Sequence, residues 1–324
     1  MIWGIIGILI IAILWFLFWT PYPFILLLRR KEEEPREKGR PDQKEIEQGL
    51  IIRKGIAYPS KYPLATYDLY YEQGTQPKRV LVWVHGGSFI SGSSIGTKNY
   101  GPMMAKEGTL FCAINYTLAP RHHFPVQILQ IDEVLQHLPD IIFKEGLEMP
   151  NALYLGGDSA GANLAAAYAC MATTKDLASK CSIELQAKQK ISGMLLYCGP
   201  YDFSEQLDKP EFKAFRLMFK YIGWAYLGKK HWQKHEEKLL ASPYLQVSEG
   251  FPATYICDGK KFSFLWQGKK LEEKLRSLNV PVSSRFYEEM PHEFQFDYVK
   301  YPQEAMQVFE DSCAFMKETE RNLV

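Results

Sequence analysis

The stretch Gly157-Asp158-Ser159-Ala160-Gly161 narrows the fold of this 324-residue sequence more than any other. It lies between the apolar run 153–155, which has the length of a buried strand, and apolar residues at helical spacing over 160–173. A G-x-S-x-G sequence in this context puts its serine on a sharp, strained turn, where neighbouring backbone leaves no room for a side chain at the glycines. We therefore predict that Ser159 is a nucleophile and that the N–H of Ala160, at the helix start, stabilises developing negative charge.

Strands and helices are predicted to alternate on both sides of this stretch. Apolar runs of strand length occur at 80–84, 110–116, 153–155, 194–198, 253–257 and 282–287, and apolar residues at helical spacing occur at 125–143, 160–173, 266–278 and 301–317. Such alternation is typical of a mostly parallel sheet with helices on both faces. Residues 202–240 interrupt it, and we predict that they form a helical cap over the site, together with residues 48–67.

Two further motifs supply the other groups that a serine nucleophile requires. The sequence His85-Gly86-Gly87-Ser88 follows the predicted strand 80–84, and we expect the N–H groups of Gly86 and Gly87 to complete an oxyanion hole with that of Ala160. Glycine suits this position because the backbone must approach the substrate oxygen closely. His292, in Met290-Pro291-His292, follows the last predicted strand, where the general base comes in such sites.

Together these motifs, with Asn115-Tyr116-Thr117-Leu118-Ala119-Pro120, resemble the hormone-sensitive lipase family of α/β-hydrolases, and its arylacetamide deacetylase-like branch in particular. The resemblance covers about residues 80–324. It implies the α/β-hydrolase fold and hydrolysis of short- to medium-chain or apolar carboxylic esters through an acyl-enzyme, without a cofactor. A deacetylase or amidase would use the same site.

The catalytic acid is the point at which the sequence departs from that family. The position that the resemblance assigns to it falls at Lys261 or Phe262. The nearest carboxylate is Asp258, at the end of the predicted strand 253–257, and it is our candidate for the acid. Glu288, Glu289 or the absence of any acid are the alternatives. A chain without an acid could be a catalytically impaired ligand-binding protein on the same fold.

The N-terminus predicts a membrane anchor. Residues 1–28 contain no charged side chain and no histidine, and roughly 18 to 20 apolar residues suffice to cross a bilayer core of about 30 Å. We expect a single transmembrane helix within residues 1–28, a charged linker over 29–48 and the catalytic domain over 49–324. Arg29, Arg30 and Lys31 follow the apolar segment directly, which favours a cytoplasmic location for the domain.

The overall composition limits the classes of molecule that the chain is expected to bind. The sequence has 38 basic and 37 acidic residues, so it carries no excess positive charge that would attract nucleic acid. Six cysteines occur without a C-x-x-C pair, which favours buried free thiols and predicts no metal site. A small ester is therefore the expected partner, besides the membrane. The sequence does not specify an oligomeric state.

Overall fold

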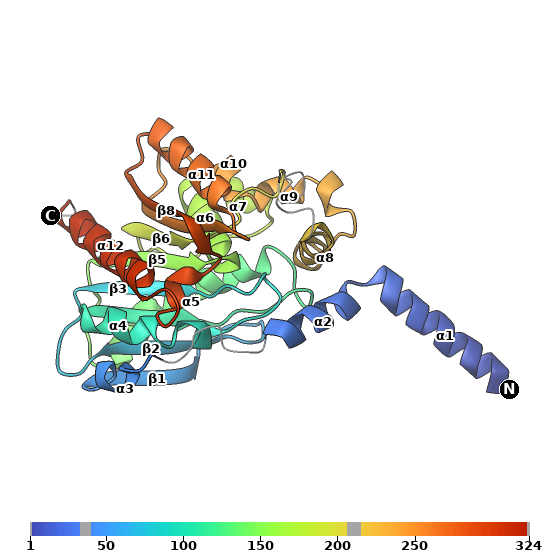
Figure 1. The fold of residues 1–324 in the computed structure, drawn as a ribbon, viewed down its shortest axis with the longest axis horizontal. Helices are drawn as coiled ribbons and strands as arrows, with labels where there is room; N and C mark the ends of the chain where they lie inside the picture. The colour runs from blue at the N-terminus through green and yellow to red at the C-terminus, as the bar shows by residue number, and fades with distance from the viewer. Residues whose placement is uncertain (1, 33–39, 206–214, 323–324) are drawn as a thin grey trace.

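A single eight-stranded sheet organises the computed structural model, which describes residues 2–32, 40–205 and 215–322 (Figure 1). The strands of these described residues lie in the order β1-β2-β4-β3-β5-β6-β7-β8. Only the β1–β2 and β2–β4 pairs are antiparallel, so the sheet is mostly parallel, as predicted. The strands are β1 (Leu50–Ala57), β2 (Thr66–Glu72), β3 (Arg79–Val84), β4 (Thr109–Ile114), β5 (Ala152–Asp158), β6 (Gly193–Tyr197), β7 (Ala253–Lys261) and β8 (Val282–Pro291).

The six predicted strands are confirmed as β3 to β8, but β1 and β2 were missed. The prediction that residues 48–67 join the cap is wrong, because these residues contribute to the first two strands of the sheet. Asp68 makes β2 hard to recognise in the sequence, since a buried carboxylate is unusual in a strand interior. Its two oxygens accept hydrogen bonds from the N–H of Gly55 (2.7 Å) and from Ser94 Oγ (2.9 Å), which offset the cost of its burial.

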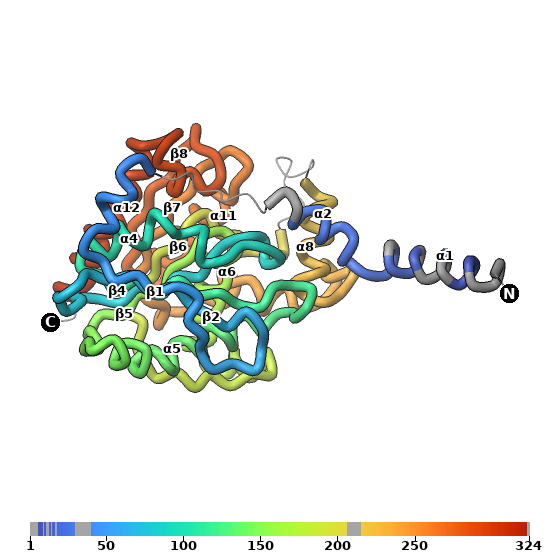
Figure 2. Tube along the Cα trace, turned by 90° about the horizontal axis from the view of Figure 1, so that it is seen from below, coloured from blue at the N-terminus to red at the C-terminus, as the bar shows by residue number. Residues whose placement is uncertain are grey.

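Helices cover both faces of the sheet and form two apolar layers. On one face, α5, α6 and α11 pack against alternate strand residues such as Val82 and Leu155, and α6 extends over 160–173 as predicted. On the other face, α4 and α12 pack around Trp83 and Phe111. Figure 2 shows the same layers from a second direction. The helices are α3 (Gln43–Ile46), α4 (Tyr100–Lys106), α5 (Val126–Lys144), α6 (Ala160–Thr173), α7 (Leu177–Lys180), α11 (Leu265–Ser277) and α12 (Pro302–Arg321).

The segment between β6 and β7 forms a group of helices near the carboxyl ends of the central strands (Figure 1). Within its described residues it contains α8 (Arg216–Leu227), α9 (Glu237–Leu240) and α10 (Pro243–Gln246). Gly228, in the left-handed conformation, ends α8, and Trp232 packs so close to Gly223 that no side chain fits at that helix position. This segment corresponds to the predicted cap, of which residues 206–214 lie outside the described part of the chain.

The described residues begin with the helices α1 (Ile2–Trp19) and α2 (Tyr22–Glu32), and α1 projects away from the rest of the molecule (Figures 1 and 2). In contrast, α2 lies against α8, where the rings of Phe24 and Tyr221 stack with centroids 4.5 Å apart. Arg29 donates hydrogen bonds to the carbonyl oxygens of Ile90 (2.6 Å) and Ala119 (2.8 Å). The first residue of the predicted linker is thus bound to the domain.

The predicted membrane span is not confirmed. Among the helices that the described residues form, none combines the length and the apolar character needed to cross a membrane.

Candidate active site

The serine elbow has the local structure that its sequence predicts. Ser159 adopts φ 50° and ψ −118° between β5 and α6, a strained conformation for a residue with a side chain. A Cβ at Gly161 would collide with the carbonyl oxygen of Val84 on β3, and one at Gly157 would collide with the backbone of Gly161. The two glycines are therefore required by close backbone contacts between β3, β5 and α6.

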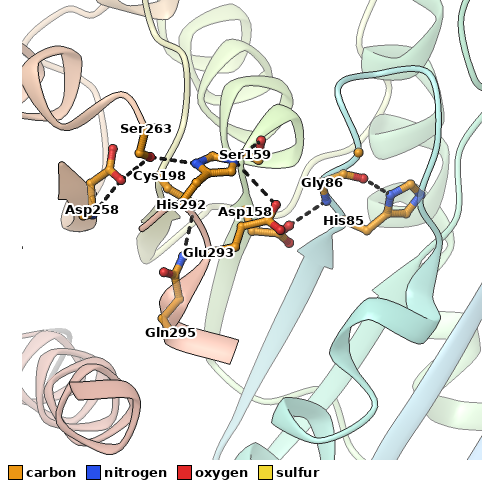
Figure 3. A network of polar contacts seen from close by, with 12 residues as sticks. His85, Gly86, Asp158, Ser159, Cys198, Asp258, Ser263, His292, Glu293 and Gln295 are labelled. Atoms are coloured by element: carbon orange, nitrogen blue, oxygen red, sulfur yellow. Dashed lines mark hydrogen bonds and ion pairs between the residues drawn. The ribbon is translucent and has the colours of Figure 1, made fainter. Parts of the chain in front are cut away.

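His292 lies within hydrogen-bonding distance of the predicted nucleophile (Figure 3). Its Nε2 is 2.9 Å from Ser159 Oγ, a distance expected for a nucleophile and its general base. The histidine follows directly after β8, and its backbone N–H donates to the carbonyl of Lys261 at the end of β7 (3.0 Å). The ring of Phe264 packs edge-on against the imidazole, with centroids 5.7 Å apart. These contacts fix the ring in a position suited to proton transfer.

The other imidazole nitrogen faces a serine that was missed in the sequence. Nδ1 of His292 is 2.7 Å from Ser263 Oγ, and Ser263 Oγ in turn donates to Asp258 Oδ1 at 2.5 Å (Figure 3). Asp258 Oδ1 also accepts the N–H of Gly259 at 2.7 Å. The candidate acid thus lies close to His292, and the structure places a hydroxyl between them. The only signal for Ser263 was its position beside Phe262, where the resemblance would place the acid.

The alternative acids lie elsewhere. Glu288 is exposed and pairs with Lys260 (2.7 Å) and Lys269 (3.1 Å), and Glu289, also exposed, pairs with Lys261 (2.7 Å). Both side chains are therefore engaged at the surface by lysines.

Burial is the dominant influence on Asp258, which is 1 % exposed. Burial raises the pKa of Asp258 well above its usual value, and the hydrogen bonds from Ser263, Gly259 and Phe264 oppose that rise. Cys198, at the end of β6, also contributes a ligand-type atom: the donor atoms of Cys198, Asp258 and His292 lie within 4.8 Å of one another. Hydrogen bonds already engage Asp258 and His292, so this cluster does not indicate a metal site.

The loop over residues 85–88, predicted to form the oxyanion hole and here named the oxyanion loop, is held by Asp158, another residue that was missed in the sequence although it lies inside the elbow motif. Its carboxylate accepts Trp83 Nε1–H at Oδ1 (2.8 Å) and the N–H of Gly86 at Oδ2 (2.9 Å). The prediction that Gly86 donates to the oxyanion is therefore wrong, because its N–H is already bound to a carboxylate. Gly87 has φ 114°, and Ser88 follows at the cavity wall.

His85 supports the same loop from behind. Its Nδ1 is 2.6 Å from the carbonyl oxygen of Gly86, and its ring stacks on Tyr116 with centroids 4.3 Å apart. Burial lowers the pKa of His85 to about 4, although the contact with the Gly86 carbonyl opposes that change. At neutral pH the ring is uncharged, and Nδ1–H donates to the carbonyl. His85 therefore has a structural contact and no contact with the nucleophile.

A largely apolar cavity of about 160 Å³ opens onto Ser159 and His292. The cap contributes to its wall through Phe219 and Ile222 of α8. Tyr221 instead stacks on Phe24 of α2, and Phe215 packs against Phe262. The lining residues are Ser88, Phe89, Ser159, Ala160, Pro200, Phe203, Met218, Phe219, Ile222, Phe262, Phe264 and His292.

Comparison with known proteins agrees with this geometry. Residues 81–296 match the family described by the alpha/beta hydrolase fold. The chain belongs to the α/β-hydrolase family. The predicted resemblance to its hormone-sensitive lipase-like members is confirmed, as is the prediction that the chain is a hydrolase enzyme.

Individual relatives of this α/β-hydrolase include an esterase of Acinetobacter venetianus, 26% identical over 243 residues that cover 73% of this chain and 74% of the relative. Arylacetamide deacetylase of Oryctolagus cuniculus is 34% identical over 98 residues, which are 28% of this chain but only 24% of that protein. Among solved structures, inhibited esterase B of Lactobacillus rhamnosis has a TM-score of 0.73 at 18% identity, covering 92% of this chain and 94% of that one. The thermophilic carboxylesterase EstE1 has a TM-score of 0.69 at 15% identity, with 92% and 97% covered. At these identities the structural likeness establishes the fold alone.

Proposed function

We propose that this α/β-hydrolase cleaves carboxylic esters through an acyl-enzyme on Ser159. The observation that carries the proposal is the 2.9 Å separation of Ser159 Oγ and His292 Nε2 at the floor of an apolar cavity. Ser159 attacks the ester carbonyl as His292 Nε2 takes its proton, and His292 then returns that proton to the leaving alcohol. A water molecule, deprotonated by the same nitrogen, releases the acid and regenerates Ser159.

The oxyanion of each tetrahedral intermediate would be held by the N–H groups of Gly87, Ser88 and Ala160. Ser88 and Ala160 line the cavity beside Ser159, whereas the N–H of Gly86 is bound to Asp158. Backbone donors that are fixed before the substrate arrives need little reorganisation during the reaction, which is why such donors contribute strongly to the rate.

The substrate class follows from the size and lining of the cavity. A volume of about 160 Å³ is small beside the roughly 300 to 1,000 Å³ of pockets that hold drug-sized ligands. Phe203, Phe219 and Ile222 provide an apolar wall. The acyl group would therefore be short and apolar, and an acetylated amide of the same shape is the second candidate.

Hydrolysis of p-nitrophenyl acetate, butyrate and octanoate tests this proposal. We expect turnover that falls with chain length and that decreases by roughly 10⁴-fold or more in Ser159→Ala. A fluorophosphonate should label the wild-type protein and leave Ser159→Ala unlabelled. Turnover that is indifferent to Ser159→Ala would rule out the mechanism.

A catalytically impaired ligand-binding protein is the alternative. It would bind esters or related apolar molecules without turnover and without fluorophosphonate labelling. The Ser159–His292 hydrogen bond argues against it, because a binding protein has no physical need for a nucleophile aligned with a base. The labelling experiment distinguishes the two.

Attachment to a membrane through α1 remains a further proposal. Ile8, Trp15, Phe18 and Trp19 expose more than half of their surface, and apolar and indole side chains favour the lipid interface. Sedimentation with phospholipid vesicles should retain the full chain and release the variant Trp15→Glu/Phe18→Glu; equal binding of both proteins would contradict the proposal. A cytoplasmic domain and a single-pass topology are predictions from the sequence alone.

A further inference from the structure

Three hydrogen bonds connect the proposed nucleophile to a buried carboxylate. Ser159 Oγ lies 2.9 Å from His292 Nε2, His292 Nδ1 lies 2.7 Å from Ser263 Oγ, and Ser263 Oγ lies 2.5 Å from Asp258 Oδ1. We infer that Ser263 and Asp258 act as one unit in place of a single catalytic acid, with Ser263 as the residue that positions His292 and Asp258 as the charge behind it. The inference rests on the proposed esterase function and names how that same site is completed.

The proton positions along this chain follow from Asp258 Oδ1. This oxygen accepts the N–H of Gly259, which can only donate, so Oδ1 is an acceptor. The single proton of Ser263 then points to Oδ1, as the short 2.5 Å distance also indicates. Ser263 Oγ is left to accept Nδ1–H of His292, which leaves a lone pair on Nε2 for the Ser159 hydroxyl. A neutral imidazole in this tautomer is the form that a general base requires.

Ser263 lies between Asp258 and His292 because of the path that the chain takes at the end of β7. Asp258 is buried in the strand, and the side chains that follow it, up to Phe262, point elsewhere: Lys260 and Lys261 pair with exposed glutamates and Phe262 is 74 % exposed. Ser263 is the next residue whose side chain turns inward, and it is 4 % exposed. A two-atom hydroxymethyl group therefore spans the space that the carboxylate leaves.

In the reaction, the proton moves only from Ser159 Oγ to His292 Nε2 and then to the leaving group. Ser263 keeps its own proton, and Asp258 takes none. The role of the pair is to hold the tautomer and to favour the imidazolium that forms after proton transfer. Cys198, Cys257 and Tyr201 also lie close to Asp258; burial, and after it the charge of Asp258, raises the pKa of each of these groups.

The test is a double-mutant cycle on the full chain, with kcat and KM for p-nitrophenyl acetate measured from pH 5 to pH 9. Ser263→Ala and Asp258→Asn should each lower kcat by roughly 10²- to 10⁴-fold with little change in KM, the range expected for a defective base or acid. Because the two residues act as one unit, the double variant should be no slower than the slower single variant. Ser263→Thr keeps the hydroxyl and should restore most of the activity.

The pH profile separates positioning from loss of folded structure. His292 must be uncharged to act as a base, and the charge of Asp258, transmitted through Ser263, favours the imidazolium. Removal of either residue should therefore shift the acidic limb of kcat/KM to lower pH. The carboxylate of Glu293, 3.7 Å from His292 Nε2, is unchanged in all of these variants, so the shift reports the Asp258 side of the ring. Ser312→Ala removes an equally buried serine that hydrogen-bonds to Tyr197 and should leave both the rate and the profile unchanged.

Three outcomes overturn the inference. Ser263→Ala with kcat within about threefold of wild type would show that no bridge is needed. Additive losses in the double variant would show that the two residues act separately. Loss of activity in Ser263→Ala that Ser263→Thr does not restore, with an unshifted pH profile, would show a packing role only. The esterase proposal fails in a different way: it is overturned if Ser159→Ala keeps its activity, whatever the Ser263 and Asp258 variants do.

Discussion

The nucleophile arm of the site, residues 157–161, and the acid arm, residues 258–264, meet at His292 but are built from different contacts. In the nucleophile arm, the backbones of β3, β5 and α6 approach so closely that Gly161 cannot carry a side chain. In the acid arm, the connection to His292 is made by two side chains, Ser263 and Asp258, in a loop that also contains the exposed Phe262. A motif fixed by backbone contact admits few substitutions, whereas a hydrogen bond to an imidazole can be supplied from more than one position in the chain.

The largest effect should come from Gly161→Ala. Its Cβ would meet the Val84 carbonyl, which cannot move without disturbing β3, so the free energy of unfolding should fall by about 3 kcal/mol or more. Urea unfolding followed by circular dichroism measures the change. Gly96→Ala is the control, since no heavy atom lies within 4 Å of its added Cβ. Equal stability of the two variants would show that backbone contact does not constrain the nucleophile arm at Gly161.

Next in size is Asp158→Asn, which acts on the oxyanion loop. An amide can accept from only one of the two donors, Trp83 Nε1–H or the N–H of Gly86, and presents its NH₂ group to the other. Displacement of the loop should lower kcat by roughly 10²-fold, a value typical for loss of an oxyanion donor, with KM little changed. Steady-state kinetics with p-nitrophenyl acetate measures it. If only KM changes, Asp158 does not act through the oxyanion loop.

A smaller effect concerns stability in the acid arm. Because burial raises the pKa of Asp258, folding favours its protonated form, and stability present below the ordinary pKa of about 3.9 is lost as pH rises through the folded value. Asp258→Asn lacks this loss. The melting temperature of the variant should therefore exceed that of the wild type by an amount that grows as pH rises above about 3.9 and becomes constant once Asp258 is ionised in the folded protein, while its activity falls. A difference in melting temperature that shrinks as pH rises would contradict the raised pKa of Asp258.

The smallest effect is expected for Phe262→Ala, also in the acid arm. Phe262 is 74 % exposed, so the free energy of unfolding should change by no more than about 0.5 kcal/mol. Urea unfolding beside Gly161→Ala gives the direct contrast between the two arms. A loss as large as that of Gly161→Ala would show that the acid arm is as constrained as the elbow.

Features that depend on a local pattern could be predicted from the sequence, whereas features that depend on contacts between distant residues could not. Strands β3 to β7 and the bounds of α6 could be predicted from the sequence because both faces of these strands are largely buried, which leaves continuous apolar runs. The first two strands could not. Asp68 interrupts the apolar pattern of β2, and its hydrogen-bond partners, Gly55 and Ser94, lie elsewhere in the sequence. The edge strand β1 is partly to fully exposed and has no buried apolar run. Ser159 and His292 were identified by their motifs, whereas Ser263 has no motif.

Two further results depended on contacts that no local pattern records. Gly86 lies in a motif that predicts an oxyanion donor. In the structure its N–H is bound instead by the carboxylate of Asp158, which comes close because β3 and β5 are neighbours in the sheet. Arg29 directly follows the apolar N-terminal segment, which predicts a basic residue beside a membrane. In the structure its side chain donates hydrogen bonds to the carbonyl oxygens of Ile90 and Ala119.

The sequence by itself determined the fold class, the elbow and the pairing of Ser159 with His292, because each depends on local spacing or on glycines that a backbone contact requires. Only the tertiary structure decided that the N–H of Gly86 is bound to Asp158 and how a carboxylate connects to His292. The physical reason is that a hydrogen bond depends on where two groups lie in space, and Asp258, Ser263 and His292 come together only once β7 and β8 pair side by side.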